Sequence, residues 1–313
     1  MSEALVIEAL TAAIGSDNDS RAAAEAALGG WESNASPGFI ASLVKVVQHT
    51  EAVPAPARLL AAIVAKNAVG SSWRKTMGTK EWSFVPAEEK AFIRSGVGAR
   101  NAFPPAPACP RHTSALRSDS CLPGRAESLL MSEPTEQVAL QLGLLIANMA
   151  HFDFPSEWPH LLSGLVGCAA WEDASNTPEA KRRAMRTTKQ VTLALSRKRP
   201  SINSAEQSDA TIAGTLQELV DSRLEELKQM RTTAVASFGA VRQQCIGHVE
   251  AVIAGGAEQE VAMRVKMGTT SCRVLAAMIK MLSSISSPAA AATEVGSPPR
   301  LAGTESGLLA SFR

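Results

Sequence analysis

The run from Arg58 to Arg74, RLLAAIVAKNAVGSSWR, decides the fold class of the chain. Its large apolar side chains recur at the i, i+3, i+4, i+7 spacing of an amphipathic helix: Leu59, Leu60, Ile63 and Val64. Lys66 shares a flank with Leu59 and Ile63, and small alanines continue the apolar face. Small residues would let a second helix approach closely, so we expect this helix to pack inside a larger helical assembly.

The end of the same run carries a polar and aromatic pattern. Gly70 to Ser72 are expected to break the helix, so Trp73 would lie just past its end, beside Arg74 and Lys75. A large ring beside two positive charges indicates either a tryptophan that packs in the core or a group of residues that binds a partner protein.

A second run, Glu136 to Leu162, reads EQVALQLGLLIANMAHFDFPSEWPHLL. Its helical stripe consists of Val138, Leu142, Leu145 and Met149. Pro155 and Pro159 are expected to open the next helix, because proline is tolerated in a first turn and not deeper in a helix.

These runs together resemble the amino-terminal domain of the importin-beta (karyopherin) superfamily. The family motifs A-E-x-x-L, R-x-x-A-x-x-x-x-K-N with a tryptophan, and D-x-P-x-x-W-P occur here in the family's order. The matching residues are Ala24, Glu25, Leu28, Arg58, Ala62, Lys66, Asn67, Trp73, Asp153, Pro155, Trp158 and Pro159. The segments VPAEEKAFIRSG (85–96) and KRRAMRTTKQVTLALSRKR (181–199) are most similar to the importin-eleven-type receptors. The resemblance covers most of residues 1–285.

The rest of the chain also predicts helices. Candidate helices begin near Ser2, at a cap on Ser20 ending at Gly29-Gly30, and at Pro37, Pro86, Pro155 and Pro178; later ones span 211–230, 234–253 and 261–282. No sustained apolar alternation predicts a strand. Helix pairs recurring about every 40–47 residues are typical of HEAT or armadillo repeats. The predicted fold is an all-α superhelical solenoid.

Four segments follow from this reading. Residues 1–101 are predicted to be an importin N-terminal domain with the first repeats, and residues 125–285 further HEAT-like repeats. Residues 102–124 form a Pro-rich irregular insertion, either a loop or wrongly translated non-coding sequence. Residues 286–313 are predicted to be a disordered tail. Since family members are several times longer, the chain is expected to be the amino-terminal part of a receptor.

Composition limits the partners. There are 31 Lys+Arg against 30 Asp+Glu, so no net field draws the chain to nucleic acid or an anionic membrane. The five cysteines lie far apart without a C-x-x-C pair, which favours a reducing compartment and argues against disulfides or zinc. The amino terminus lacks the basic flank of a signal peptide, and the longest apolar run, 138–150, is shorter than the about 18 residues of a membrane span.

A catalytic function is not indicated. The five histidines lack metal-binding spacing, and neither a G-x-S-x-G elbow nor a phosphate-binding loop is present. His151 near Asp153 is the nearest polar pair, and we interpret it as an ordinary helix end. We expect no catalytic residue, metal or cofactor.

The resemblance implies a binding function. Receptors of this family bind the GTPase Ran in its GTP form, carry protein cargo past nuclear pore proteins, and shuttle between cytoplasm, nuclear envelope and nucleus. On the matching motif, Lys66, Asn67, Trp73 and Arg74 are candidates for binding Ran, with the alternative that Asn67 and Trp73 join one repeat to the next. A structural role in an inter-helix turn is expected for Asp153, Pro155, Trp158 and Pro159. A monomer is expected.

Several alternatives stay open. A helical-repeat scaffold without Ran-dependent release would show the same apolar stripes. An export receptor would share most of the motifs. The basic clusters Lys181–Arg183 and Arg197–Arg199 have the spacing of a bipartite nuclear-targeting signal, although such runs are more often solvated helix faces. Cargo identity is not encoded in any recognisable motif.

Overall fold

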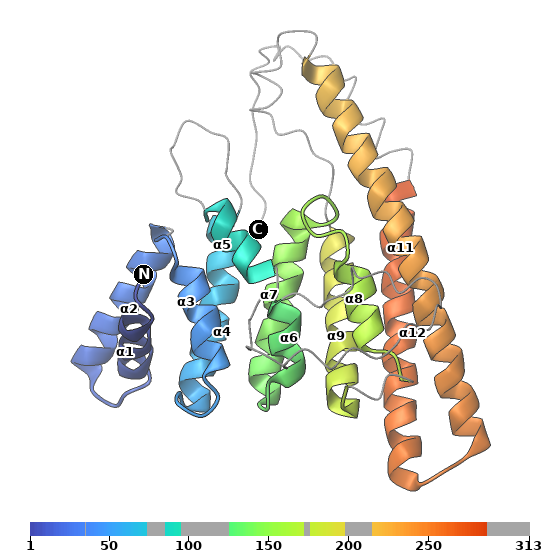
Figure 1. Ribbon diagram of the computed structural model, residues 1–313, viewed down its shortest axis with the longest axis horizontal. Coiled ribbons are helices and arrows are strands. Elements are labelled where there is room, and N and C mark those ends of the chain that lie inside the picture. The colour runs from blue at the N-terminus through green and yellow to red at the C-terminus, as the bar shows by residue number, and fades with distance from the viewer. Residues whose placement is uncertain (35, 74–84, 95–124, 172–175, 198–214, 287–313) are drawn as a thin grey trace, which may run out of the picture.

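The computed structural model describes residues 1–34, 36–73, 85–94, 125–171, 176–197 and 215–286. This part of the chain forms eleven α-helices and contains no strand (Figure 1). The first six are α1 (Glu3–Ala13), α2 (Asn18–Ser33), α3 (Phe39–Gln48), α4 (Ala55–Ser72), α5 (Ala87–Arg94) and α6 (Arg125–Ser132). They are followed by α7 (Glu136–Asp153), α8 (Leu161–Cys168), α9 (Pro178–Leu195), α11 (Thr215–Ala254) and α12 (Glu258–Ser286).

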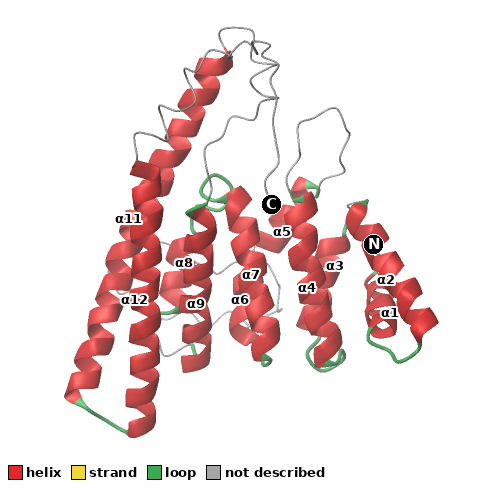
Figure 2. Ribbon diagram, turned by 180° about the vertical axis from the view of Figure 1, so that it is seen from behind, coloured by secondary structure: helices red, strands yellow, loops and turns green. Residues whose placement is uncertain are grey.

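The helices stand side by side in two layers. In one layer α2 packs on α4, α4 on α7, α7 on α9 and α9 on α12. In the other layer α1 packs on α3, α3 on α5, α5 on α6 and α8 on α11. The row advances in chain order from α1 to the long hairpin of α11 and α12, as the view from behind also shows (Figure 2). The predicted all-α solenoid of helical repeats is confirmed.

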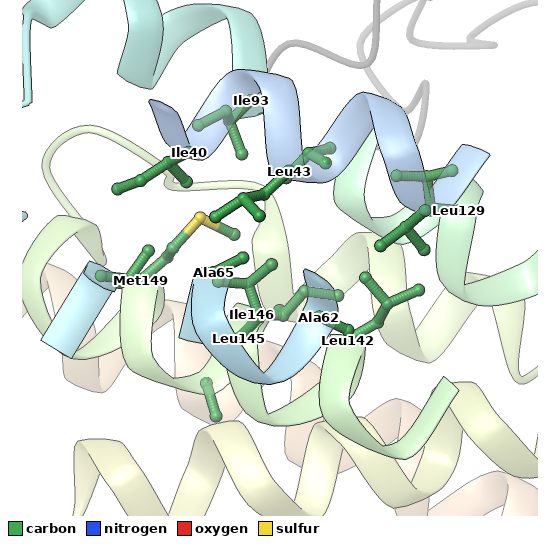
Figure 3. Packing of buried hydrophobic residues seen from close by; sticks show 14 of the residues in the cluster. Ile40, Leu43, Ala62, Ala65, Ile93, Leu129, Leu142, Leu145, Ile146 and Met149 are labelled. Carbon is green, nitrogen blue, oxygen red and sulfur yellow. The ribbon is translucent and has the colours of Figure 1, made fainter. Parts of the chain in front are cut away.

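One apolar core runs through most of the row. It extends from Val6 in α1 to Leu195 in α9 and reaches Met281 in α12. Figure 3 shows side chains of five successive helices, α3 to α7, meeting in this core. A second cluster joins α8 and α9 to the long hairpin through Val166, Met185, Val241, Met267 and Met278. Because each helix pair buries one face on the next, the stack continues without a separate domain boundary in the described residues.

The buried face of α4 is the alanine part of the expected apolar face. Ala57, Ala61 and Ala62 are fully buried, and Ala65 and Ala68 are 1% exposed, whereas Leu59, Leu60 and Val64 are only partly buried. Helix α4 lies between α3 and α7, so its central face carries the small side chains and the larger ones pack at its flanks.

Predicted helix limits were wrong in four helices. Helix α2 is capped by the Asp17 carboxylate, which accepts a hydrogen bond from the Ser20 backbone N–H, and it continues through Gly29 and Gly30. Glycine weakens a helix by only about 1 kcal/mol. Trp31, beyond the two glycines, packs edge-on against Phe39 at 5.9 Å between ring centroids and holds the helix to the core.

The limits of three other helices, α4, α11 and α8, also differ from those predicted. Helix α4 continues through Gly70 to Ser72, and a single helix, α11, spans the expected break near residue 230, where Met230 and Ala234 pack into the core. Helix α8 begins at Leu161 and not at Pro155, because the backbone turns after Asp153. The Asp153 carbonyl accepts hydrogen bonds from the N–H groups of both Glu157 and Trp158 at that turn.

Some predictions lie outside the described residues. These are the positions of Arg74, the 102–124 insertion and the tail beyond Ser286. Helix α6, which the sequence patterns did not predict as a separate helix, is described. No described helix has the length and the apolar character that crossing a bilayer requires.

Candidate functional site

The second half of α4 presents the candidate binding residues. With the alanine face buried, Asn67 is exposed and Lys66 is half-buried. The Lys66 carbonyl accepts a hydrogen bond from Asn148 Nδ2 of α7 at 3.2 Å. The backbone beneath Lys66 is therefore fixed by the neighbouring helix, while the Asn67 side chain faces solvent.

Trp73 lies at the C-terminal end of α4 and is fully buried. Its indole Nε1 donates a hydrogen bond to Asp153 Oδ1 at 2.9 Å, and the other oxygen of Asp153 accepts one from Arg94 Nη1, also at 2.9 Å. The ammonium of Lys90 lies 5.3 Å from the centre of the indole ring. A buried ring cannot contact a partner, so the geometry favours the joining role for Trp73 over the Ran-binding role.

The D-x-P-x-x-W-P motif forms the turn between α7 and α8. Asp153 is 6% exposed and Trp158 is 8% exposed, and Trp158 packs in the main core. Pro155 is buried and Pro159 is partly exposed in the same turn. Since Asp153 accepts bonds from α4 and α5 through its side chain and from the turn through its carbonyl, this motif joins four helices.

Arg58, the first residue of the middle motif, forms a buried ion pair. Its Nη1 lies 2.8 Å and 2.6 Å from the two carboxylate oxygens of Glu133, and the two side chains are 4% and 2% exposed. The Thr135 backbone N–H also donates to Glu133 at 2.8 Å, and Arg183 of α9 donates to the Glu133 carbonyl. Buried charges need such partners, because desolvation is costly. The short link between α6 and α7 is thereby bound to both α4 and α9.

A second charged cluster lies at the surface between α7 and α9. The Glu136 carboxylate lies 2.6 Å from Arg186, 3.0 Å from Arg182 and 3.1 Å from Arg183. Burial alone would raise the pKa of the Glu136 carboxyl, but hydrogen bonds from Arg186 and Arg183 and the charges of Arg186 and Arg182 lower this pKa below its ordinary value. Three guanidinium groups around one carboxylate leave this surface locally positive.

The first basic cluster, Lys181–Arg183, is largely engaged in contacts within the fold. Lys181 is 5% exposed and donates to the Trp171 carbonyl at 2.8 Å, and Arg183 is 7% exposed and bound to α7 and its preceding link. A targeting receptor needs accessible basic side chains, so the nuclear-targeting alternative is not supported at this cluster. Of the second cluster, Arg197 is exposed, and residues 198 and 199 lie outside the described part.

No group of His, Cys, Asp and Glu side chains in the described residues could hold a metal ion. His151 Nδ1 lies 3.4 Å from the Ala194 carbonyl of α9, which suits a histidine at a helix contact.

Two of the residues that build this site were not identified from the sequence. Arg94 and Glu133 complete the pairs of Asp153 and Arg58, from positions 59 and 75 residues away. Arg94 lies in segment 85–96, and the resemblance of this segment to importin-eleven-type receptors could have indicated its importance. Glu133 precedes Pro134 in a link between helices, and no sequence pattern pointed to it.

Comparisons with known proteins agree with the motif resemblance. The profile of the importin-beta N-terminal domain matches residues 24–97. Importin-11 of Mus musculus and Importin-11 of Homo sapiens are each 26% identical over 196 residues, which is 62% of this chain and 16% of either relative. The chain therefore matches only a small part of the length of these relatives.

One solved structure is similar over a longer stretch. It is titled "The exportin Cse1 in its cargo-free, cytoplasmic state", and it is 18% identical with a TM-score of 0.46 over 91% of this chain and 23% of that one. A TM-score this low supports no functional conclusion. Residues 24–97 therefore match the importin-beta N-terminal domain, and the chain is similar to the Importin-11 relatives over 196 residues.

Proposed function

We propose that this chain is the amino-terminal region of a nuclear transport receptor that binds Ran in its GTP form and carries protein cargo through the nuclear pore. The observation that carries the proposal is the importin-beta N-terminal domain at residues 24–97, which contains all of α4. The receptor shuttles between cytoplasm and nucleus and contacts nuclear pore proteins on the way. It acts as a monomeric binding protein, without a catalytic step and without binding nucleic acid or inserting into a membrane.

The geometry of α4 supports this role. Asn67 is exposed and Lys66 is half-buried, and the helix that carries them is held near both of its ends by buried polar contacts, Arg58 with Glu133 and Trp73 with Asp153. Rigid placement lowers the entropy lost on binding, so the same side chains give more affinity than they would on a loop. Lys66 is suited to an acidic group of the GTPase, and Asn67 to a backbone amide. Arg74 remains a proposed contact next to them.

Ran releases the cargo if the binding of Ran lowers the affinity of the receptor for its cargo. When one ligand lowers the affinity for the second, the second lowers the affinity for the first by the same factor. A stack of helix pairs can supply this coupling, because a change in the angle between neighbouring pairs adds up along the solenoid. The direction of transport is not part of the proposal.

The test is a calorimetric titration of the full 313-residue chain against Ran loaded with a non-hydrolysable GTP analogue and against Ran loaded with GDP. We expect binding to the GTP form alone. Lys66→Glu should weaken that binding about tenfold or more, because charge reversal places like charges across the contact. Lys266→Glu is the matched control, since Lys266 is an exposed lysine on α12, remote from the proposed contact.

Two outcomes would overturn the proposal. Equal binding to both nucleotide forms, or no binding by a helical, monomeric sample, would favour a helical-repeat scaffold without Ran-dependent release. An equal effect of Lys66→Glu and Lys266→Glu would remove Lys66 from the contact while leaving the receptor function itself in place.

A further inference from the structure

Two cysteines that are remote in sequence meet in the long hairpin. Cys245 of α11 and Cys272 of α12 are 27 residues apart, and their Sγ atoms are 3.2 Å from each other. Cys245 is 8% exposed, whereas Cys272 is exposed, and both are free thiols. No sequence pattern indicated this pair, and the wide spacing of the cysteines argued against any disulfide.

The two sulfur atoms are held in place by the packing around them. The Cys245 Sγ also lies 3.9 Å from the carbonyl oxygen of Gly268, one helical turn before Cys272. A Cβ added at Gly268 would lie 3.4 Å from the His248 Cβ, so the two backbones approach closely at this level. Below and above the pair, Val241, Met267 and Val274 are fully buried between the helices. The thiols therefore face each other from two rigid, closely packed helices.

We propose that Cys245 and Cys272 form a reversible intramolecular disulfide, with a low-molecular-weight disulfide of the glutathione type as the oxidant. A disulfide bond is about 2.0 Å long, so the sulfur atoms must approach by roughly 1 Å, which a small side-chain rotation supplies. This is a modification site on the helical stack, and it is independent of the proposed Ran contact on α4.

The reaction balances in two exchange steps. The Cys272 thiolate attacks one sulfur of the oxidised glutathione, the S–S bond of glutathione breaks, and one reduced glutathione leaves. Cys245 then loses its proton to solvent and attacks the Cys272 sulfur, which releases the second reduced glutathione and forms the protein disulfide. The two protein thiols lose two electrons, and the oxidant gains them.

The exposure of the two thiols sets this order. Only Cys272 is open to an oxidant in solution. Burial, together with the neighbouring Cys272, raises the pKa of the Cys245 thiol to about 11, so Cys245 stays protonated at neutral pH and does not react first. A mixed disulfide on Cys272 then places its sulfur beside Cys245, where a nucleophile is held within contact distance.

The bond would join α11 and α12 about midway along α12, away from their connecting turn at Gly255 and Gly256. Because α12 also packs on α9, the closed hairpin holds the last described layer in one arrangement. In a reducing compartment the thiol form prevails, and the bond would form only transiently under oxidation.

The test treats the full chain with oxidised glutathione, blocks remaining thiols with an alkylating agent, and digests the product with trypsin. Mass spectrometry should find peptide 243–264 joined to peptide 267–273 as the main product. The oxidised chain should unfold several degrees higher than the reduced one, and dithiothreitol should reverse the shift. A product in which Cys272 keeps glutathione and Cys245 is alkylated would overturn the proposal, as would an unmodified Cys272.

Two variants make the result specific. Cys272→Ser should abolish the linked peptide and leave Cys245 unmodified, and it should fold because the side chain is exposed. Cys168→Ser, which changes a third described cysteine, should leave the linkage at its full yield. A linkage lost in Cys168→Ser would mean that the pairing observed in the wild-type chain runs through Cys168.

Discussion

The joint between α4 and α7 and the hairpin of α11 and α12 connect helices in two different ways. The first joins two helices of 18 residues, and to their apolar packing it adds a buried ion pair with Glu133, in the link before α7, and an indole–carboxylate hydrogen bond. The second joins helices of 40 and 29 residues mainly through apolar side chains, and its described ion pairs, Lys228 with Glu225 and Arg264 with Glu260, lie within single helices at the surface.

The difference concerns how strictly the angle between helices is set. A buried charge is satisfied only at one distance and direction, so misplacing it costs several kcal/mol. Apolar contacts tolerate small shifts because they are not directional. The first joint therefore fixes the orientation of the candidate binding helix, whereas the hairpin gains a directional link only if its two cysteines become bonded.

The largest test of this contrast is Glu133→Ala, which removes the partner of a buried guanidinium. We expect a loss of about 3–5 kcal/mol in the free energy of unfolding, because the Arg58 charge is left without compensation. Urea denaturation followed by circular dichroism measures it. The control on the hairpin is Glu225→Ala, which breaks an exposed pair and should cost less than about 1 kcal/mol. Similar losses for both variants would contradict the contrast.

The next test removes the shared acceptor of the first joint. Asp153→Ala leaves the Trp73 N–H and the Arg94 guanidinium without their partner, and we expect a loss of about 2–3 kcal/mol. Trp73→Phe keeps an aromatic ring and removes the donor. In a double-mutant cycle the two changes should show a coupling of about 1 kcal/mol in urea denaturation, and strictly additive losses would mean that the hydrogen bond contributes nothing.

A pair of glycine substitutions should give changes of opposite sign. A Cβ at Gly143 of α7 would lie 2.7 Å from the hydroxyl of buried Thr187 and 2.6 Å from Gln190 Oε1, so Gly143→Ala should destabilise by about 1–3 kcal/mol. A Cβ at Gly239 of α11 meets nothing within 4 Å. Gly239→Ala should therefore stabilise by about 0.5–1 kcal/mol through helix propensity. Thermal unfolding separates the two, and a stabilising Gly143→Ala would refute close packing of α7 on α9.

The smallest effect concerns pH. The pKa of Glu136 is lowered in the folded chain, so its contribution to stability is present above the ordinary carboxyl value near 4.5 and is lost as the pH falls through the lowered value. Because this carboxylate is 43% exposed, the contribution should stay below about 1 kcal/mol. Unfolding temperatures between about pH 6 and pH 3 should fall less steeply in Glu136→Gln than in the wild-type chain. Parallel curves would show that the three arginines do not act through Glu136.

The sequence predicted some helices well and others poorly for identifiable reasons. In α9 the four residues that share one face by helical spacing, Ala184, Thr188, Val191 and Leu195, are all buried. In α4 the alanines Ala57, Ala61 and Ala68 of the expected apolar face are buried, whereas Leu60 and Val64 of the same face are only partly buried. Hydrophobic periodicity indicates that a helix has a buried side, but it does not give the distance to the neighbouring helix, which decides the size of side chain that fits there.

The candidate site was predicted in part. Three motifs in the family's order pointed to Lys66, Asn67, Trp73 and Asp153, and the domain match covers the first three of these residues. That Trp73 is buried against Asp153, and not exposed, depended on a contact across 80 residues of chain. No local pattern contains that information.

The sequence by itself determined the helical class and the likeness to the importin-beta N-terminal domain, because apolar spacing along a helix and short motifs are local properties of the chain. The tertiary structure alone decided which charges are paired, as for Arg58 with Glu133, and which thiols meet, as for Cys245 with Cys272. Such contacts join residues 75 and 27 positions apart, and they arise only when whole helices are packed in one register. Their strength depends on burial, which is a property of the assembled layers and not of any single segment.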